Sequence, residues 1–79
     1  MYKLKKDIDF ETLIKYNYKK EEEGYTKEIE SYIVPRFIVI KKNREIICKH
    51  ALGNKINLTK FDIEDLITND LVEVKKWIW

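Results

Sequence analysis

The stretch RFIVIKKNREIICK, residues 36–49, decides the fold because it is the most strand-like part of the chain. Two apolar runs flank the polar residues 41–44, a spacing that predicts a β-hairpin. In the first run Phe37 and Val39 share one face of the strand, and Ile38 and Ile40 share the other. A strand that is apolar on both faces must be covered on both sides. We therefore expect one face to meet the tail of the chain, a second copy or another protein.

The segments around this hairpin predict two short helices. Phe10 and the apolar residues after it have helical spacing and follow two N-cap candidates, Asp7 and Asp9. Asn17 suits the left-handed conformation that ends a helix. A second apolar helical face occupies residues 63–67. Each helix spans only about two turns and depends on tertiary packing for its stability.

Extended segments are expected at residues 1–6, 25–34 and 71–75, and residues 21–24 read as a turn. With the hairpin they predict an α+β fold, a small antiparallel sheet of three to five strands with two short helices. The expected order is (β)-α-β-β-β-α-β, which is compatible with a split β-α-β topology. We expect residues 1–79 to form a single domain.

The composition excludes several classes of protein. With 79 residues, 44% of them hydrophobic, the chain is too short for two domains and too apolar for disorder. A single Cys excludes a disulfide scaffold and fits a reducing compartment. The longest apolar run, Phe37–Ile40, is far shorter than the ~20 residues of a membrane-spanning helix. We expect a cytoplasmic protein without a membrane partner.

No catalytic motif is present. Cys48 and His50 are the only soft metal ligands, whereas a zinc site needs about four. Their spacing on a strand is also too wide for a reliable nucleophile pair. Asp62 and Glu64 do not share one helix face, and no phosphate-binding loop or dinucleotide fingerprint occurs. We therefore expect a protein that is not an enzyme and that has no metal or cofactor.

The net charge of +2 hides strong local patches. Residues 31–60 carry +6, whereas residues 21–30 and 61–70 carry −4 each. Such patches attract charged partners. The basic block predicts one alternative function, a small nucleic-acid-binding module that uses the hairpin region 36–60. Its candidate contacts are Arg36, Lys41, Lys42, Arg44 and Lys49.

Aromatic and acidic residues favour a different function, protein binding. Trp and Tyr anchor many interfaces, and a run of glutamates suits a basic partner such as the channel of a nuclease. The candidate contacts are Trp77, Trp79, Tyr25, Tyr32, Glu21, Glu22 and Glu23. The chain is similar to small accessory proteins of phages and mobile elements in four respects: its small size, its many residues with AT-rich codons, its lack of catalytic motifs and its two-faced strand. Our leading hypothesis is a protein-binding domain, acting on another protein or as a homodimer, with a host nuclease or defence complex as the expected target of inhibition.

Overall fold

The computed structural model describes residues 2–29 and 35–74. Within these ranges the chain forms seven strands, one 3-10 helix (η1) and one α-helix. The strands are β1 (Tyr2–Leu4), β2 (Lys19–Glu21), β3 (Gly24–Ile29), β4 (Arg36–Lys41), β5 (Glu45–His50), β6 (Lys55–Ile56) and β7 (Val72–Val74). The helices are η1 (Phe10–Tyr16), between β1 and β2, and α1 (Glu64–Thr68), between β6 and β7.

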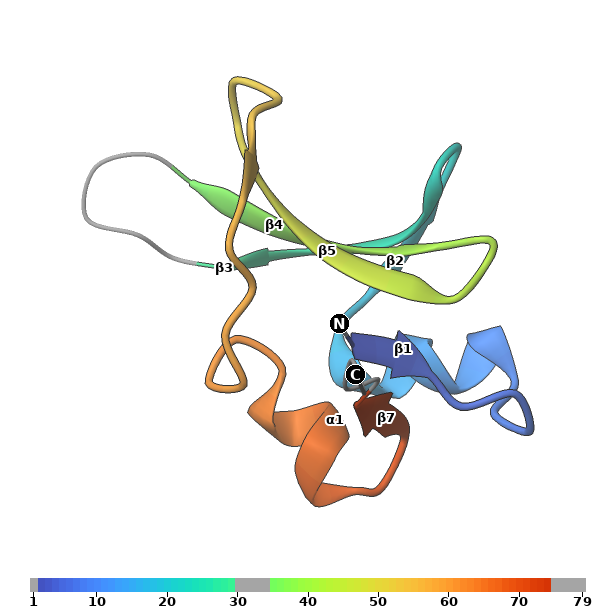
Figure 1. Ribbon diagram of the computed structural model, residues 1–79. Helices are drawn as coiled ribbons and strands as arrows, with labels where there is room; N and C mark the ends of the chain where they lie inside the picture. The colour runs from blue at the N-terminus through green and yellow to red at the C-terminus, as the bar shows by residue number, and fades with distance from the viewer. Residues whose placement is uncertain (1, 30–34, 75–79) are drawn as a thin grey trace.

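The described strands form one antiparallel sheet. Their order is β2-β3-β4-β5-β1-β7, and β6 pairs with the second half of β5. The hairpin expected at residues 36–49 is confirmed, because β4 and β5 pair with Ile40 opposite Ile46. Arg44 closes its turn at φ 76°, in the left-handed region. The sheet curls, so that β1 and β7 lie beneath β5 (Figure 1).

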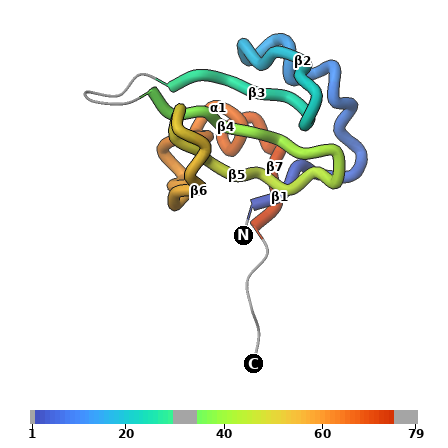
Figure 2. Tube along the Cα trace, turned by 90° about the horizontal axis from the view of Figure 1, so that it is seen from above, coloured from blue at the N-terminus to red at the C-terminus, as the bar shows by residue number. Residues whose placement is uncertain are grey.

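The main core lies on the inner face of this curled sheet. Both helices pack on that side, and Figure 2 shows α1 behind β4 when the sheet is viewed from above. The buried cluster consists of Leu4, Leu13, Tyr18, Tyr25, Ile38, Ile40, Ile46, Cys48, Ile63, Leu66, Leu71 and Val72. Each fully buried aliphatic side chain contributes about 1.5–3 kcal/mol, so this cluster is the main source of stability.

The predicted fold class, an α+β domain of three to five strands with two helices, is wrong. The caps of the first helix are as expected: the Asp9 side chain accepts a hydrogen bond from the Glu11 amide, and Asn17 is left-handed at φ 70°. The helix between them, however, is a 3-10 helix. Apolar spacing over two turns does not distinguish the two helix types, and short segments are often 3-10.

Two strands were missing from the predicted order. All three residues of β2 are exposed, so they show no apolar alternation, and β6 has only two residues. The strand order also departs from the topology of two split β-α-β units, in which one strand lies between the two strands that flank each helix. The strands that flank η1, β1 and β2, are separated by β3, β4 and β5. Of the strand expected at 25–34, β3 covers the part up to Ile29, and residues 30–34 lie outside the described ranges.

A tight turn brings β2 and β3 together and depends on Gly24. Its φ of +148° is one that residues with a side chain rarely adopt. A Cβ added there would lie 2.1 Å from the carbonyl oxygen of Ile40 on the neighbouring β4. The close approach of β3 to β4 therefore requires glycine. The turn at Gly24 also determines the position of the glutamates that precede it.

Candidate functional site

Two turns rise from the outer face of the sheet and border a groove. One joins β2 to β3 and the other joins β5 to β6, and both project away from the helices (Figure 1). The hollow between them has a volume of about 420 Å³. Its lining residues are Glu21, Glu22, Glu23, Thr26, Phe37, Val39, Lys49, His50, Ala51 and Gly53. We call this hollow the outer groove.

The floor of the outer groove is apolar. Val39 of β4 stands between Thr26 of β3 and Ile47 of β5 in the strand register. Val39 and Ile47 are only 2% and 5% exposed, yet neither belongs to the main core cluster. Phe37, on the same face, is partly exposed. The second apolar face of this strand therefore forms the floor of a groove, while the helices pack on the first.

One wall of the outer groove is acidic. Glu21, Glu22 and Glu23 follow one another at the β2–β3 turn, and all three are exposed. Within residues 2–29 and 35–74, neither Glu21 nor Glu22 has an ion-pair partner. Two carboxylates beside an apolar floor attract a cation whose stem is apolar, the chemistry of a lysine or arginine side chain.

An ion pair ties this acidic wall to β5. The Lys49 Nζ donates a hydrogen bond of 2.8 Å to a Glu23 carboxylate oxygen. That hydrogen bond holds the pKa of Glu23 below its ordinary value, and the charges of Lys49 and Lys41 act in the same direction. Exposed ion pairs of this kind add little to stability.

The basic residues predicted to contact nucleic acid are mostly engaged within the protein. Arg36 pairs with Asp62 at 3.3 Å, Lys41 with Glu45 at 3.3 Å, and Lys49 with Glu23. Of the five candidates, only Lys42 has neither an ion pair nor a hydrogen bond to another described residue. The five side chains therefore do not present one continuous patch of uncompensated charge.

Arg44 anchors the loop between β1 and η1. Its Nη1 donates hydrogen bonds of 2.6 Å to the carbonyl oxygens of Lys5 and Ile8, on the loop between β1 and η1. The guanidinium also lies 4.6 Å from the centroid of the Phe10 ring. These contacts hold η1 against the β4–β5 turn, and they direct the side chain inward.

The residues predicted to contact a protein partner separate into three groups. Glu21, Glu22 and Glu23 line the outer groove. Tyr25 lies on the inner face, is 9% exposed, and stacks on Phe10 with the ring centroids 5.6 Å apart. The third group, Tyr32, Trp77 and Trp79, lies outside the described residues.

Cys48 and His50 do not form a site together. Cys48 is fully buried in the main core, where burial raises the pKa of its thiol, whereas His50 lines the outer groove. Among the described residues, no group of three His, Cys, Asp or Glu side chains is placed to hold a metal ion. The same ranges contain no helix of the length and apolar character needed to cross a bilayer.

No sequence pattern indicated that the wall opposite the glutamates belongs to the same site. Residues 51–54 form the turn between β5 and β6, in which Gly53 adopts a φ of 94°. A glycine at this position is the signal that the sequence offers for a tight turn. Thr26 and His50 were likewise not predicted to contact a protein partner. Their role in the groove follows from the curl of the sheet, which a local pattern does not reveal.

No protein-family model, curated protein or solved structure matches this chain.

Proposed function

We propose that this chain is a non-enzymatic protein-binding domain that docks a basic segment of a partner protein in the outer groove. The observation that carries the proposal is the combination of an apolar floor and an acidic wall in one hollow of about 420 Å³. Apolar contact supplies affinity, and charge complementarity supplies orientation and selects the partner.

The groove suits a segment in which basic and apolar side chains alternate. Phe37 and Val39 offer the apolar contact. The charge is received by the carboxylates of Glu21 and Glu22, which have no ion-pair partner among the described residues. Glu23 adds a third carboxylate when a partner cation replaces Lys49. That the partner is a nuclease or a defence complex stays a prediction from charge and composition. The acidic wall is the one feature of the groove that supports it.

The alternative function, nucleic-acid binding, has less support. Phosphate recognition needs several uncompensated cations on one surface. The carboxylates of Asp62, Glu45 and Glu23 already neutralise three of the five candidate cations, and backbone carbonyls hold Arg44. A negatively charged backbone would also meet the glutamates of the β2–β3 turn.

The experiment is a comparative capture from a lysate of the source cells. The immobilised bait is wild-type protein, Phe37→Ala, or the double variant Glu21→Lys and Glu22→Lys. Phe61→Ala is the matched control, because Phe61 is 76% exposed and lies outside the groove. We expect the proteins retained by wild type to be retained by Phe61→Ala and lost from both groove variants, with the fold of each variant checked by circular dichroism.

Three results would contradict the proposal. The first is that no protein is retained and wild type is monomeric by light scattering. The second is that the groove variants retain the same proteins as wild type. Retention that falls equally in Phe37→Ala and Phe61→Ala would also count against the groove, because only the first side chain lines it.

A further inference from the structure

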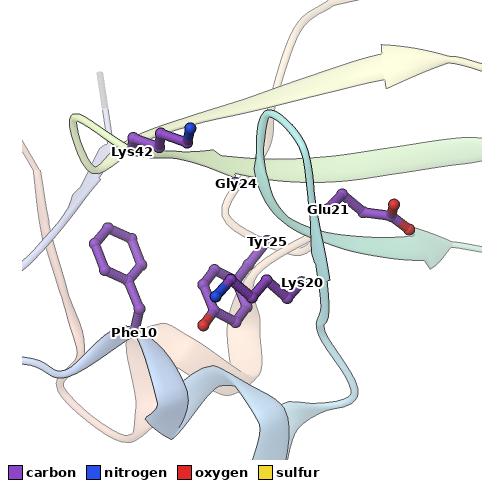
Figure 3. Close-up of a pocket in the computed structure, with 6 residues that line it drawn as sticks. All are labelled: Phe10, Lys20, Glu21, Gly24, Tyr25 and Lys42. Carbon is purple, nitrogen blue, oxygen red and sulfur yellow. The ribbon is translucent and has the colours of Figure 1, made fainter.

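A second cavity lies on the other side of the β2–β3 hairpin, at the end of the sheet near η1. Its volume is about 230 Å³, and its lining is mostly apolar. Figure 3 shows the six lining residues, Phe10, Lys20, Glu21, Gly24, Tyr25 and Lys42. They come from η1, from β2 and β3, and from the β4–β5 turn. We call this hollow the aromatic cavity.

Two aromatic rings form one side of the aromatic cavity. Phe10 and Tyr25 stack with centroids 5.6 Å apart and planes inclined by 7°, so they present parallel ring surfaces. Tyr25 is 9% exposed and packs in the main core, which fixes its orientation. Rigid, parallel rings favour a flat apolar ligand group, because stacking then orders few additional side chains.

Cations surround these rings. Lys20 and Lys42 line the cavity and are exposed, and neither has an ion pair within residues 2–29 and 35–74. Arg44 lies 4.6 Å from the Phe10 centroid, and its hydrogen bonds run to neutral carbonyl oxygens. Glu21 is the one acidic residue in the lining. The local charge is therefore positive beside an apolar hollow.

We propose that the aromatic cavity binds a small aromatic anion, a single ring that carries a carboxylate. The ring lies against Phe10 and Tyr25, and the carboxylate meets the ammonium groups of Lys20 and Lys42. A volume of about 230 Å³ is below the ~300–1,000 Å³ of sites for larger ligands, so one ring fills it. This site shares only Glu21 with the lining of the outer groove, and it does not rest on the protein-binding function proposed for that groove.

The test is a titration of ¹⁵N-labelled protein with benzoate, followed by amide chemical shifts. Benzyl alcohol supplies the same ring without the charge, and acetate supplies the charge without the ring. We expect saturable shifts at Phe10, Gly24 and Tyr25, and a Kd of about 1 mM, as is usual for a ligand of so few atoms. The two comparison compounds should bind about 10-fold more weakly.

Variants show which cations take part. Lys42→Met and Lys20→Met keep most of the aliphatic stem and remove the charge, and each should weaken benzoate binding by about 5- to 10-fold. Lys60→Met is the matched control, because Lys60 lies 6.0 Å from the Phe61 ring, away from the cavity. The proposal is overturned if benzoate binds no more tightly than benzyl alcohol and acetate, or if Lys60→Met weakens binding as much as Lys42→Met does.

Discussion

The two faces of β4 are equally apolar in sequence and differ in what covers them. On the inner face Ile38 and Ile40 are fully buried among residues from β1, η1, β5 and α1. On the outer face Val39 is also buried, but its neighbour Phe37 is partly exposed in a groove that two turns border. A few short elements thus close one face completely and leave the other hollow.

This difference separates stability from recognition within one strand. The inner face supplies the contacts that hold the domain together, and substitutions there should unfold it. The outer face keeps part of its apolar surface open, and substitutions there should change binding more than stability.

The largest effect is expected at the inner face. Ile38→Ala should lower the free energy of unfolding by about 2–5 kcal/mol, because it removes a fully buried side chain and leaves a cavity in the core. Urea denaturation followed by circular dichroism measures this loss. A loss below about 1 kcal/mol would mean that the inner face is loosely packed, against the burial found here.

A smaller effect is expected at the outer face. Phe37→Ala should cost about 1 kcal/mol, because the side chain is only partly buried and its removal widens an open groove without creating a closed cavity. The same denaturation experiment applies. An equal loss of stability in Phe37→Ala and Ile38→Ala would break the distinction between the two faces.

Tyr18 provides a subtler test of the inner face. Its hydroxyl is buried without a hydrogen-bond partner among the described residues, so Tyr18→Phe should change the free energy of unfolding by no more than about 1 kcal/mol at pH 7. Burial, with a contribution from the charge of Asp65, raises the pKa of Tyr18 above its ordinary value of 10.0. Its folded-state pKa therefore exceeds the unfolded one.

The sign of the pH dependence follows from that shift. The stability linked to the protonated phenol is complete below pH 10.0 and is lost as the pH rises above it. Unfolding measured from pH 8 to pH 11 should show a smaller alkaline loss in Tyr18→Phe than in wild type. Identical pH profiles would show that Tyr18 is accessible to water.

The smallest effect concerns the ion pair across the outer groove. Lys49→Met should return the pKa of Glu23 toward its ordinary value of 4.5, because the Lys49 hydrogen bond is the main cause of its lowering. The folded-state pKa of Glu23 is the lower one, so the contribution of the pair is present above pH 4.5 and is lost as the pH falls through that lowered pKa.

Carboxyl ¹³C shifts report this titration directly. Lys42→Met is the matched control, since Lys42 forms no ion pair with Glu23. The pKa of Glu23 should stay low in that variant. A normal pKa in wild type would remove the ion pair from the description of the groove.

Local patterns predicted the local features of this fold. Two apolar runs and the polar turn between them identified the hairpin of β4 and β5, and Asp9 and Asn17 marked the ends of η1. Patterns failed where tertiary contacts decide the outcome. Nothing in Lys19–Glu21 distinguishes an edge strand from a loop, because all three side chains are exposed and the pairing with β3 requires no apolar pattern in them.

The candidate site was predictable only in its parts. The glutamate run and the strand with two apolar faces were both visible in the sequence, but no sequence pattern connects them. They meet because the curled sheet places the β2–β3 turn above Phe37 and Val39, a long-range relation that spacing along the chain does not encode. The aromatic cavity depends likewise on η1 reaching Tyr25 from a segment 15 positions earlier in the chain.

The position of β1 has a consequence for the order of events during folding. Strands β2 to β5 pair with their neighbours in the chain, whereas Tyr2 of β1 pairs with Ile46 and Val74. Closing such long loops has a large entropic cost, and distant pairings slow folding. We therefore expect the meander of β2 to β5 to form early, with most of the lining of both hollows, and η1 and the β5–β6 turn to complete them. We expect the pairing of β1 with β5 and β7 to follow as the slower step and to close the core.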